Sequence, residues 1–222
     1  MDALLADPAL LDRLGRTALV AHPASADANG CPSAARLRAA LGDGLAALFS
    51  PEHGFFGLAA AGEKVDSLRH PAWNIPVHSL YGKHRRPSRA MFKGIDTVVF
   101  DLQDLSIRCY TYVSTLRYIL EEAGRFGVRV VVTDRGNPLD GVVDGPMLDP
   151  ALESFVGCFP GPLVYGLTVG EAARWMKRTL RLPVKLDVVP MPGYRRGMTL
   201  PPHRWISPSP AIRSPHSALC YP

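Results

Sequence analysis

The chain alternates short apolar runs with segments of helical periodicity. Six apolar runs have the length and composition of buried strands, and four segments have a helical pattern. The expected strands are residues 17–24, 44–50, 75–82, 96–104, 128–136 and 183–191, and the expected helices are residues 32–42, 87–95, 111–127 and 168–180. Continuous apolar strands separated by helices are typical of a parallel sheet covered on both faces. The pattern therefore predicts an α/β fold with a Rossmann-like, doubly wound and mainly parallel sheet.

The periodic pattern ends near Gly193. Residues 193–222 are rich in Pro and Ser and show no clear periodicity. We therefore expect a Rossmann-like domain over residues 1–192 and, over residues 193–222, an extended arm or an incomplete C-terminal domain. Because this segment has few periodic apolar residues, it should lie across the surface of the domain, with Trp205 as its anchor.

Composition and charge narrow the class of protein. Hydrophobic residues make up 47% of the chain, enough for an ordinary core, and no apolar run approaches the roughly 20 residues of a membrane helix. The first residues carry acids and no basic stretch, which predicts a cytoplasmic protein unless a leader has been lost. The net charge is +5, with basic clusters at residues 83–89 and 194–197. These clusters lack interleaved aromatic residues, so they favour a solvated face or an acidic small substrate over nucleic acid.

Polar side chains stand where several of the expected strands end. They are His22 after the first strand; Glu52 and His53 after the second; Asp101, Gln103 and Asp104, followed by Arg108, Tyr110 and Tyr112, after the fourth; and Asp134, Arg135 and Asn137 after the fifth. Ligands of such folds bind outside the carboxyl ends of the strands, so we expect these residues on one rim. Carboxyl groups crowded in a partly dry cleft raise one another's pKa, which can create a general acid.

Two short motifs come close to known sites. Residues 57–64, GLAAAGEK, resemble a phosphate-binding loop, but Glu63 would repel phosphate and no Ser or Thr follows Lys64. Residues 98–106 resemble the start of haloacid-dehalogenase phosphatases, although Gln103 occupies the position of their second aspartate. A phosphohydrolase with Asp101 as nucleophile therefore stays an alternative. Neither a dinucleotide fingerprint nor a metal-binding spacing is visible, so no cofactor and no metal are expected.

Longer motifs occur in the order of one family. They are LFSPEHGFFG, AGEKV, IPVHSLYG, DTVVFDLQDLSIRCYTYVSTL, DRGNPLDG, VDGPMLDP, SFVGCFPGPLVYGLTVGEAA and PSPAI. In these motifs the chain resembles the exo-β-N-acetylmuramidases of the NamZ type, from about Thr17 to Pro222. It departs from them at Tyr165, where the family often has His, at Asp144, where Glu is frequent, and at Ala211, where Asn is common.

The resemblance implies a Rossmann-like domain followed by a smaller C-terminal domain. It also implies a glycoside hydrolase of cell-wall recycling that releases N-acetylmuramic acid from the non-reducing ends of peptidoglycan fragments. The glutamate of PEHG, here Glu52, is implied to be catalytic. Family members continue beyond the YP at which this sequence ends, so we expect a truncated chain with weak activity or none.

These residues suggest a division of roles. Glu52 would protonate the leaving oxygen, and Asp101 or Asp104 would act as base, nucleophile or stabiliser, unless the acetamido group of the substrate replaces a protein nucleophile. Arg108 or Arg135 would pair with the lactyl carboxylate. Tyr110 and Tyr112 would stack on a sugar or fill the start of a helix. The further candidates for substrate binding are His53, Gln103, Asp134 and Asn137. A non-catalytic module that binds muropeptides is the alternative outside enzymes.

Overall fold

A computed structural model of the protein describes residues 1–198 and 205–222. Within these residues the strands form one seven-stranded sheet in the order β3-β4-β2-β1-β5-β6-β7. The strands are β1 (Thr17–Val20), β2 (Leu45–Ser50), β3 (Leu68–Arg69), β4 (Pro76–Ser79), β5 (Thr97–Phe100), β6 (Arg129–Thr133) and β7 (Lys185–Val189). All neighbours pair in parallel except β3, which lies antiparallel to β4 at one edge.

The strand order confirms the predicted fold class. With β3 set aside, the parallel strands counted along the chain follow the order 3-2-1-4-5-6 of dinucleotide-binding Rossmann folds. In such sheets the strand order reverses at one point, and ligands bind in the crevice outside the carboxyl ends there. In this sheet the reversal lies between β1 and β5, which pair from Thr17 and Thr97 to Val20 and Phe100.

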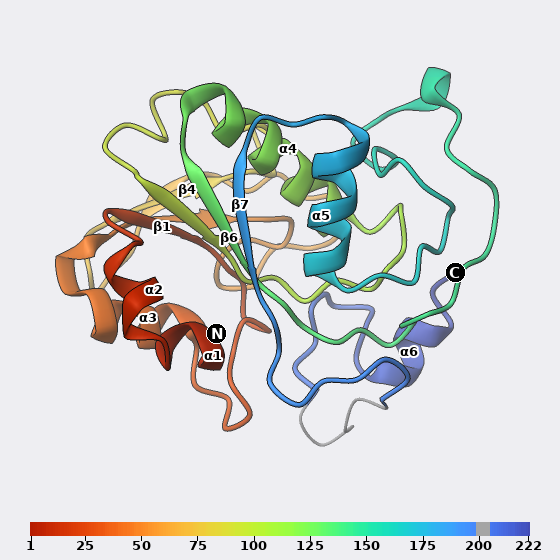
Figure 1. Ribbon diagram of the computed structural model, residues 1–222, viewed down its shortest axis with the longest axis horizontal. Helices are drawn as coiled ribbons and strands as arrows, with labels where there is room; N and C mark the ends of the chain where they lie inside the picture. Colours follow the sequence, from red (N-terminus) through yellow and green to blue (C-terminus); the bar gives the residue numbers. More distant parts are fainter. Residues whose placement is uncertain (199–204) are drawn as a thin grey trace.

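Helices cover both faces of the sheet (Figure 1). They are α1 (Asp2–Leu5), α2 (Pro8–Asp12), α3 (Ser33–Leu41), α4 (Thr111–Phe126), α5 (Val169–Thr179) and α6 (Pro215–Leu219), with 3₁₀ turns at Gly42–Gly44 and Pro150–Leu152. Because side chains of a strand alternate, β1 feeds two cores. Leu19 joins the core under α1 and α3, whereas Ala18 and Val20 join the core under α4 and α5. In the described residues no helix is long and apolar enough to cross a membrane.

One expected helix is wrong, and another is confirmed with its cap. Residues 87–95 form successive turns whose N–H groups bond three residues back, as from Met91 to Ser88, and Gly94 has a positive φ of 71°. These bonds span three residues instead of the four of an α-helix, and the left-handed Gly94 ends the segment. At α5, Thr168 accepts from the N–H of Glu171, whose side chain accepts from the N–H of Thr168, so the predicted capping box is present.

The C-terminal segment lies against the start of α4. Trp205 packs against the core under α4 and α5, and its indole N–H donates to the carbonyl of Ile212 at 2.9 Å. The hydroxyl of Tyr112 donates to the carbonyl of Pro208 at 2.7 Å, which ties α4 to this segment. Trp205 thus has the contacts expected of an anchor, while residues 199–204 of the predicted arm lie outside the described residues.

Candidate active site

The carboxyl ends of the parallel strands bring the predicted carboxylates to one rim. Glu52 follows the end of β2 by two residues, and Asp101 directly follows β5. Since β1 lies between β2 and β5, these two strands are about 10 Å apart at the usual spacing of neighbouring strands. The prediction that Glu52 and Asp101 share a rim is therefore confirmed, while their catalytic roles stay predictions.

Glu52 is a half-buried carboxylate held from two sides. Its Oε1 accepts from the N–H of Gly62 at 2.8 Å, and its Oε2 accepts from the hydroxyl of Thr111 at 2.7 Å. Gly62 belongs to the long loop after β2, and Thr111 is the first residue of α4. Two segments far apart in sequence thus fix the orientation of this carboxylate at the rim.

His53 shapes the loop that presents Glu52. Its φ is 71°, a left-handed conformation that only a few per cent of residues other than glycine adopt. Its ring is buried, with Nδ1 3.0 Å from the carbonyl of Ala59, and its own carbonyl accepts from the N–H of Ala59 at 3.2 Å. These contacts close the turn that follows Glu52, and binding of substrate by His53 stays a prediction.

Tyr81 also lies close to Glu52. It follows the end of β4, and burial together with the nearby Glu52 carboxylate raises the pKa of its hydroxyl. The sequence reasoning missed both Tyr81 and Thr111, although each lies within a quoted motif, IPVHSLYG or CYTYVSTL. A hydroxyl that follows a strand or begins a helix at the carboxyl rim is the signal that could have identified them.

Asp101 is fully buried in an ion pair with Arg135. Its oxygens accept from Arg135 Nε at 2.7 Å and Nη2 at 2.9 Å, and from the hydroxyl of Thr133 at 2.7 Å. Burial opposes ionisation, but the charge and hydrogen bonds of Arg135 outweigh it and hold the pKa of Asp101 well below its ordinary value. Arg135 also donates to the carbonyl of Ala26 at 3.2 Å, so this pair crosses the crevice between β1 and β5.

Asp104 has the opposite electrostatic environment. Its Oδ2 accepts from the N–H of Ser106 at 3.0 Å and from the hydroxyl of Tyr165, while Oδ1 is buried without a partner in the described residues. Burial raises the pKa of Asp104 to about 6. This carboxyl group can therefore gain or lose a proton near neutral pH, which is the property required of a general acid or base.

Four further predicted residues use their polar groups on local structure. Gln103 donates to the carbonyl of Gly136 at 2.9 Å, and Asn137 donates to the carbonyl of Leu167 at 3.1 Å. Arg108 donates to the carbonyls of Pro146 at 2.9 Å and Gly161 at 2.8 Å. Asp134 accepts from the N–H of Gly170 and from the hydroxyl of Thr168, both at 2.8 Å. These bonds hold the loops after β5 and β6 in place. Direct contact of these four residues with substrate stays a prediction.

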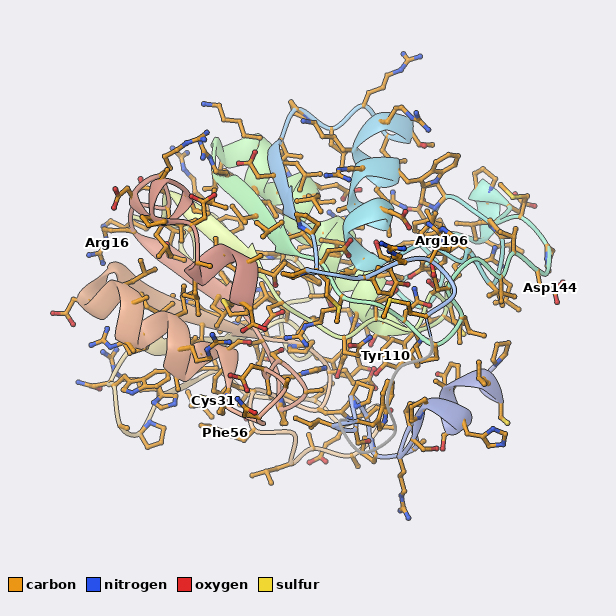
Figure 2. All side chains as sticks on the ribbon, turned by 60° about the horizontal axis from the view of Figure 1, so that its bottom comes forward. Arg16, Cys31, Phe56, Tyr110, Asp144 and Arg196 are labelled. Carbon is orange, nitrogen blue, oxygen red and sulfur yellow. The ribbon has the colours of Figure 1, made fainter. Side chains whose placement is uncertain are left out.

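An aromatic cluster lies beneath the rim at the start of α4. The ring of Tyr112 lies 4.9 Å from that of His22 and 4.8 Å from that of Tyr110, which in turn lies 6.0 Å from Tyr221 of the C-terminal segment. Of these residues, Tyr110 is labelled in Figure 2. Tyr110 and Tyr112 are buried and fill the start of the helix, the second of their two expected roles. Burial lowers the pKa of His22 to about 3, so its ring is neutral at neutral pH.

Two hollows lie at opposite ends of the strands, one at the carboxyl ends and one at the amino ends. One of about 350 Å³ is at the carboxyl edge, where its lining includes Ala26, Gln103 and Arg135 near the reversal of strand order. A larger one of about 730 Å³ is lined by Arg89 and Asp96 among others, at the amino edge and away from the predicted residues. Glu52 lines neither hollow, so it marks a separate place on the carboxyl rim. Within residues 1–198 and 205–222, no three His, Cys, Asp or Glu side chains are grouped to hold a metal ion.

Comparison with known proteins identifies a family. A sequence model described as the N-terminal part of the exo-β-N-acetylmuramidase NamZ matches residues 17–216. The peptidoglycan β-N-acetylmuramidase NamZ of Bacillus subtilis (strain 168) is 40% identical over 181 residues, which are 80% of this chain and 44% of that protein.

Two solved structures share the fold. Both are DUF1343 family proteins of Bacteroides fragilis NCTC 9343. The first has a TM-score of 0.85 at 36% identity and covers 94% of this chain and 54% of its own. The second has a TM-score of 0.81 at 27% identity and covers 98% of this chain and 57% of its own. The chain thus spans about half the length of the relatives it matches.

Proposed function

The chain belongs to the family of the exo-β-N-acetylmuramidase NamZ, in its N-terminal part, and we propose that it hydrolyses the glycosidic bond of a terminal N-acetylmuramic acid in peptidoglycan fragments. The observation that carries this proposal is the carboxylate of Glu52. It is half-buried on the carboxyl rim of a Rossmann-like sheet and is held by Gly62 and Thr111. A glycosidase needs such a carboxyl group beside the scissile oxygen.

Glu52 is the proton donor in this proposal. The Thr111 hydroxyl and the Gly62 N–H restrict its rotation, so the carboxyl group meets the leaving oxygen in a defined orientation. Protonation of that oxygen makes it a better leaving group as the sugar ring gains oxocarbenium character. His53 contributes indirectly, since its left-handed backbone turns the chain directly after Glu52.

Of the two aspartates, we favour Asp104 as the second ionisable group. Its raised pKa and its unpartnered Oδ1 leave it able to exchange a proton. Asp101 instead has its charge matched by Arg135, and we assign it to the support of the rim. The same ion pair argues against Asp101 as the nucleophile of a phosphohydrolase, and the comparisons give that alternative no support. The acetamido group of a muramic acid can itself serve as nucleophile, so Asp104 need not form a bond to the sugar.

The test is release of N-acetylmuramic acid from a chromogenic β-N-acetylmuraminide. We expect the unchanged protein to release measurable N-acetylmuramic acid at a low rate, and Glu52→Gln to lose that activity by about 100-fold or more, because the amide keeps the shape and cannot donate the proton. Glu63→Gln is the matched control, since Glu63 belongs to the same loop and, among the described residues, its side chain accepts from the N–H of Ala60 and not from the groups that hold Glu52. Activity of Glu52→Gln within a few-fold of the unchanged protein would refute the role of Glu52. Saturable binding without turnover would indicate the muropeptide-binding module instead.

We also propose that the protein acts in the cytoplasm, in the recycling of cell-wall fragments. This proposal follows from the sequence expectation and from the small saccharide fragments on which such an enzyme would act. Fractionation of cells that express the untagged protein tests it, with a cytoplasmic marker enzyme as reference. Recovery of the protein outside the cytoplasmic fraction would refute this localisation.

A further inference from the structure

Arg85 is an exposed arginine held on aromatic rings close to Glu52. Its guanidinium carbon lies 4.5 Å from the centre of the Phe155 ring and 5.6 Å from that of Tyr81. Contacts of a guanidinium with aromatic faces stabilise its position while leaving the N–H groups at its edge free to donate. Among the described residues, Arg85 forms neither an ion pair nor a hydrogen bond within ordinary distances.

The neighbouring Arg86 is a useful comparison, because it also stacks on an aromatic ring but has carboxylate partners. Arg86 also stacks on an aromatic ring, with its guanidinium carbon 3.7 Å from the centre of Tyr118. Its charge is matched, however, by an ion pair with Glu121 and a second with Glu122 at 3.3 Å. Two adjacent arginines on one row of aromatic rings thus differ in one respect, since Arg86 has carboxylate partners in the protein and Arg85 has none in the described residues.

Tyr81 connects Arg85 to the candidate active site. Burial is the main reason that the pKa of the Tyr81 hydroxyl is raised, and the Glu52 carboxylate raises it further. The positive charge of Arg85 lowers the same pKa. Glu52 and Arg85 therefore both lie near Tyr81, on the side of the rim where β4 ends. A substrate whose scissile oxygen lies at Glu52 and whose acidic substituent extends past Tyr81 would bring that substituent to Arg85.

The two arginines first considered for an acidic substituent are already occupied. Arg135 donates to both oxygens of Asp101, and Arg108 donates to the carbonyls of Pro146 and Gly161. We propose that Arg85 binds the carboxylate of the substrate and so selects an acidic sugar over a neutral one. For a terminal N-acetylmuramic acid this group is the lactyl carboxylate, and to that extent the inference rests on the proposed function.

The chemistry favours a carboxylate as the partner. A planar guanidinium can donate two parallel hydrogen bonds to the two oxygens of a carboxylate, and such charge-assisted pairs are stronger than neutral ones. The aromatic support reduces the freedom that Arg85 would lose on binding. A lysine at this position would keep the charge but would lose both the fork and the flat contact with Phe155.

The experiment compares a β-N-acetylmuraminide with its methyl ester, in which the lactyl carboxylate is blocked. For the unchanged protein we expect KM for the ester to be higher than for the acid by about 10- to 100-fold, with a smaller change in kcat. Arg85→Ala should raise KM for the acid to the value for the ester and leave the ester unaffected. Arg85→Lys should fall between them.

Arg89→Ala is the matched control. It removes the same charge four residues along the chain, at the hollow on the amino edge of the sheet. It should keep the full preference for the acid. The proposal would be overturned if Arg85→Ala preferred the acid over the ester as strongly as the unchanged protein does. It would also be overturned if Arg89→Ala lost this preference to the same extent as Arg85→Ala.

Binding measurements separate this proposal from the proposed function. If the protein releases neither sugar, calorimetric titration with N-acetylmuramic acid and N-acetylglucosamine still reports on Arg85. Tighter binding of the acidic sugar that is lost in Arg85→Ala would support the role of Arg85 although the hydrolase had failed. Equal binding of both sugars by the unchanged protein would refute it. Turnover with no difference between acid and ester would leave the hydrolase standing and reject Arg85 as the selecting residue.

Discussion

At the scale of single residues, two buried aspartates three positions apart have opposite electrostatics. Asp101 is kept charged by Arg135, whereas burial raises the pKa of Asp104 to about 6. The sequence suggests that both lie at the end of β5, yet their partners lie elsewhere along the chain. Arg135 is 34 residues from Asp101, and Tyr165 is 61 residues from Asp104. No local pattern reports such partners, so the sequence could identify the two carboxyl groups but could not separate their roles.

Asp104 makes folding stability depend on pH. Its folded-state pKa lies above its ordinary value of 3.8, so the native state binds a proton more tightly than the unfolded chain. The stabilisation is fully present below about pH 4 and is lost as pH rises through about 6, with a magnitude of about 3 kcal/mol. Asp104→Asn should remove this dependence. Urea unfolding at about pH 4.5 and pH 7.5 measures it, and parallel pH profiles of the two proteins would contradict the assignment.

The Asp101–Arg135 pair predicts a large loss on removal of one partner. Asp101→Asn should destabilise the fold by about 3 to 5 kcal/mol, because it leaves the partly buried guanidinium of Arg135 without its counter-charge. Chemical denaturation measures the loss. The double variant Asp101→Asn with Arg135→Met should recover part of it, since no unpaired charge remains. A loss below about 1 kcal/mol in the single variant would indicate that water reaches the pair.

At the scale of elements, the start of α5 joins helix and sheet. Thr168 accepts from the N–H of Glu171 and donates to Asp134, which also accepts from the N–H of Gly170. Thr168→Ala should therefore cost about 1 to 2 kcal/mol of stability, because it removes the cap and one hydrogen-bond partner of the half-buried Asp134 carboxylate. Thr168→Ser keeps the hydroxyl and should lose only a fraction of that. Thermal unfolding of the two variants checks this, and equal melting temperatures would contradict it.

The elements themselves were largely predictable from the chain. The strands ending at Val20, Ser50 and Phe100 are marked by continuous apolar runs, and such runs are buried on both faces in a parallel sheet. The two-residue strand β3 carries no such run and was not predicted, because only its pairing with β4 makes it a strand. Glu52 was identified from a motif, but its partner Thr111 depends on how α4 docks beside the loop after β2.

At the scale of the whole molecule, the C-terminal segment is part of the same core as α4. Trp205→Ala should lower the free energy of unfolding by about 2 kcal/mol, because it removes half-buried aromatic packing and the bond to Ile212. Hydrogen exchange should then speed up over residues 205–219 more than in the central strands. Trp205→Phe, which keeps most of the packing, is the control. Unchanged exchange in that segment would show that Trp205 does not anchor it.

The two edge strands of the sheet determine how readily copies of the protein associate by backbone pairing at high concentration. At one edge β3 offers two residues, and at the other β7 lies between Pro183 and Pro190 and carries Lys185 and Asp187. Proline has no N–H to donate, and charges on an edge strand oppose close approach of a second chain. Copies that meet edge to edge can therefore share few backbone bonds. Addition of further copies strand by strand is therefore disfavoured at both edges, although the central strands of the sheet are apolar.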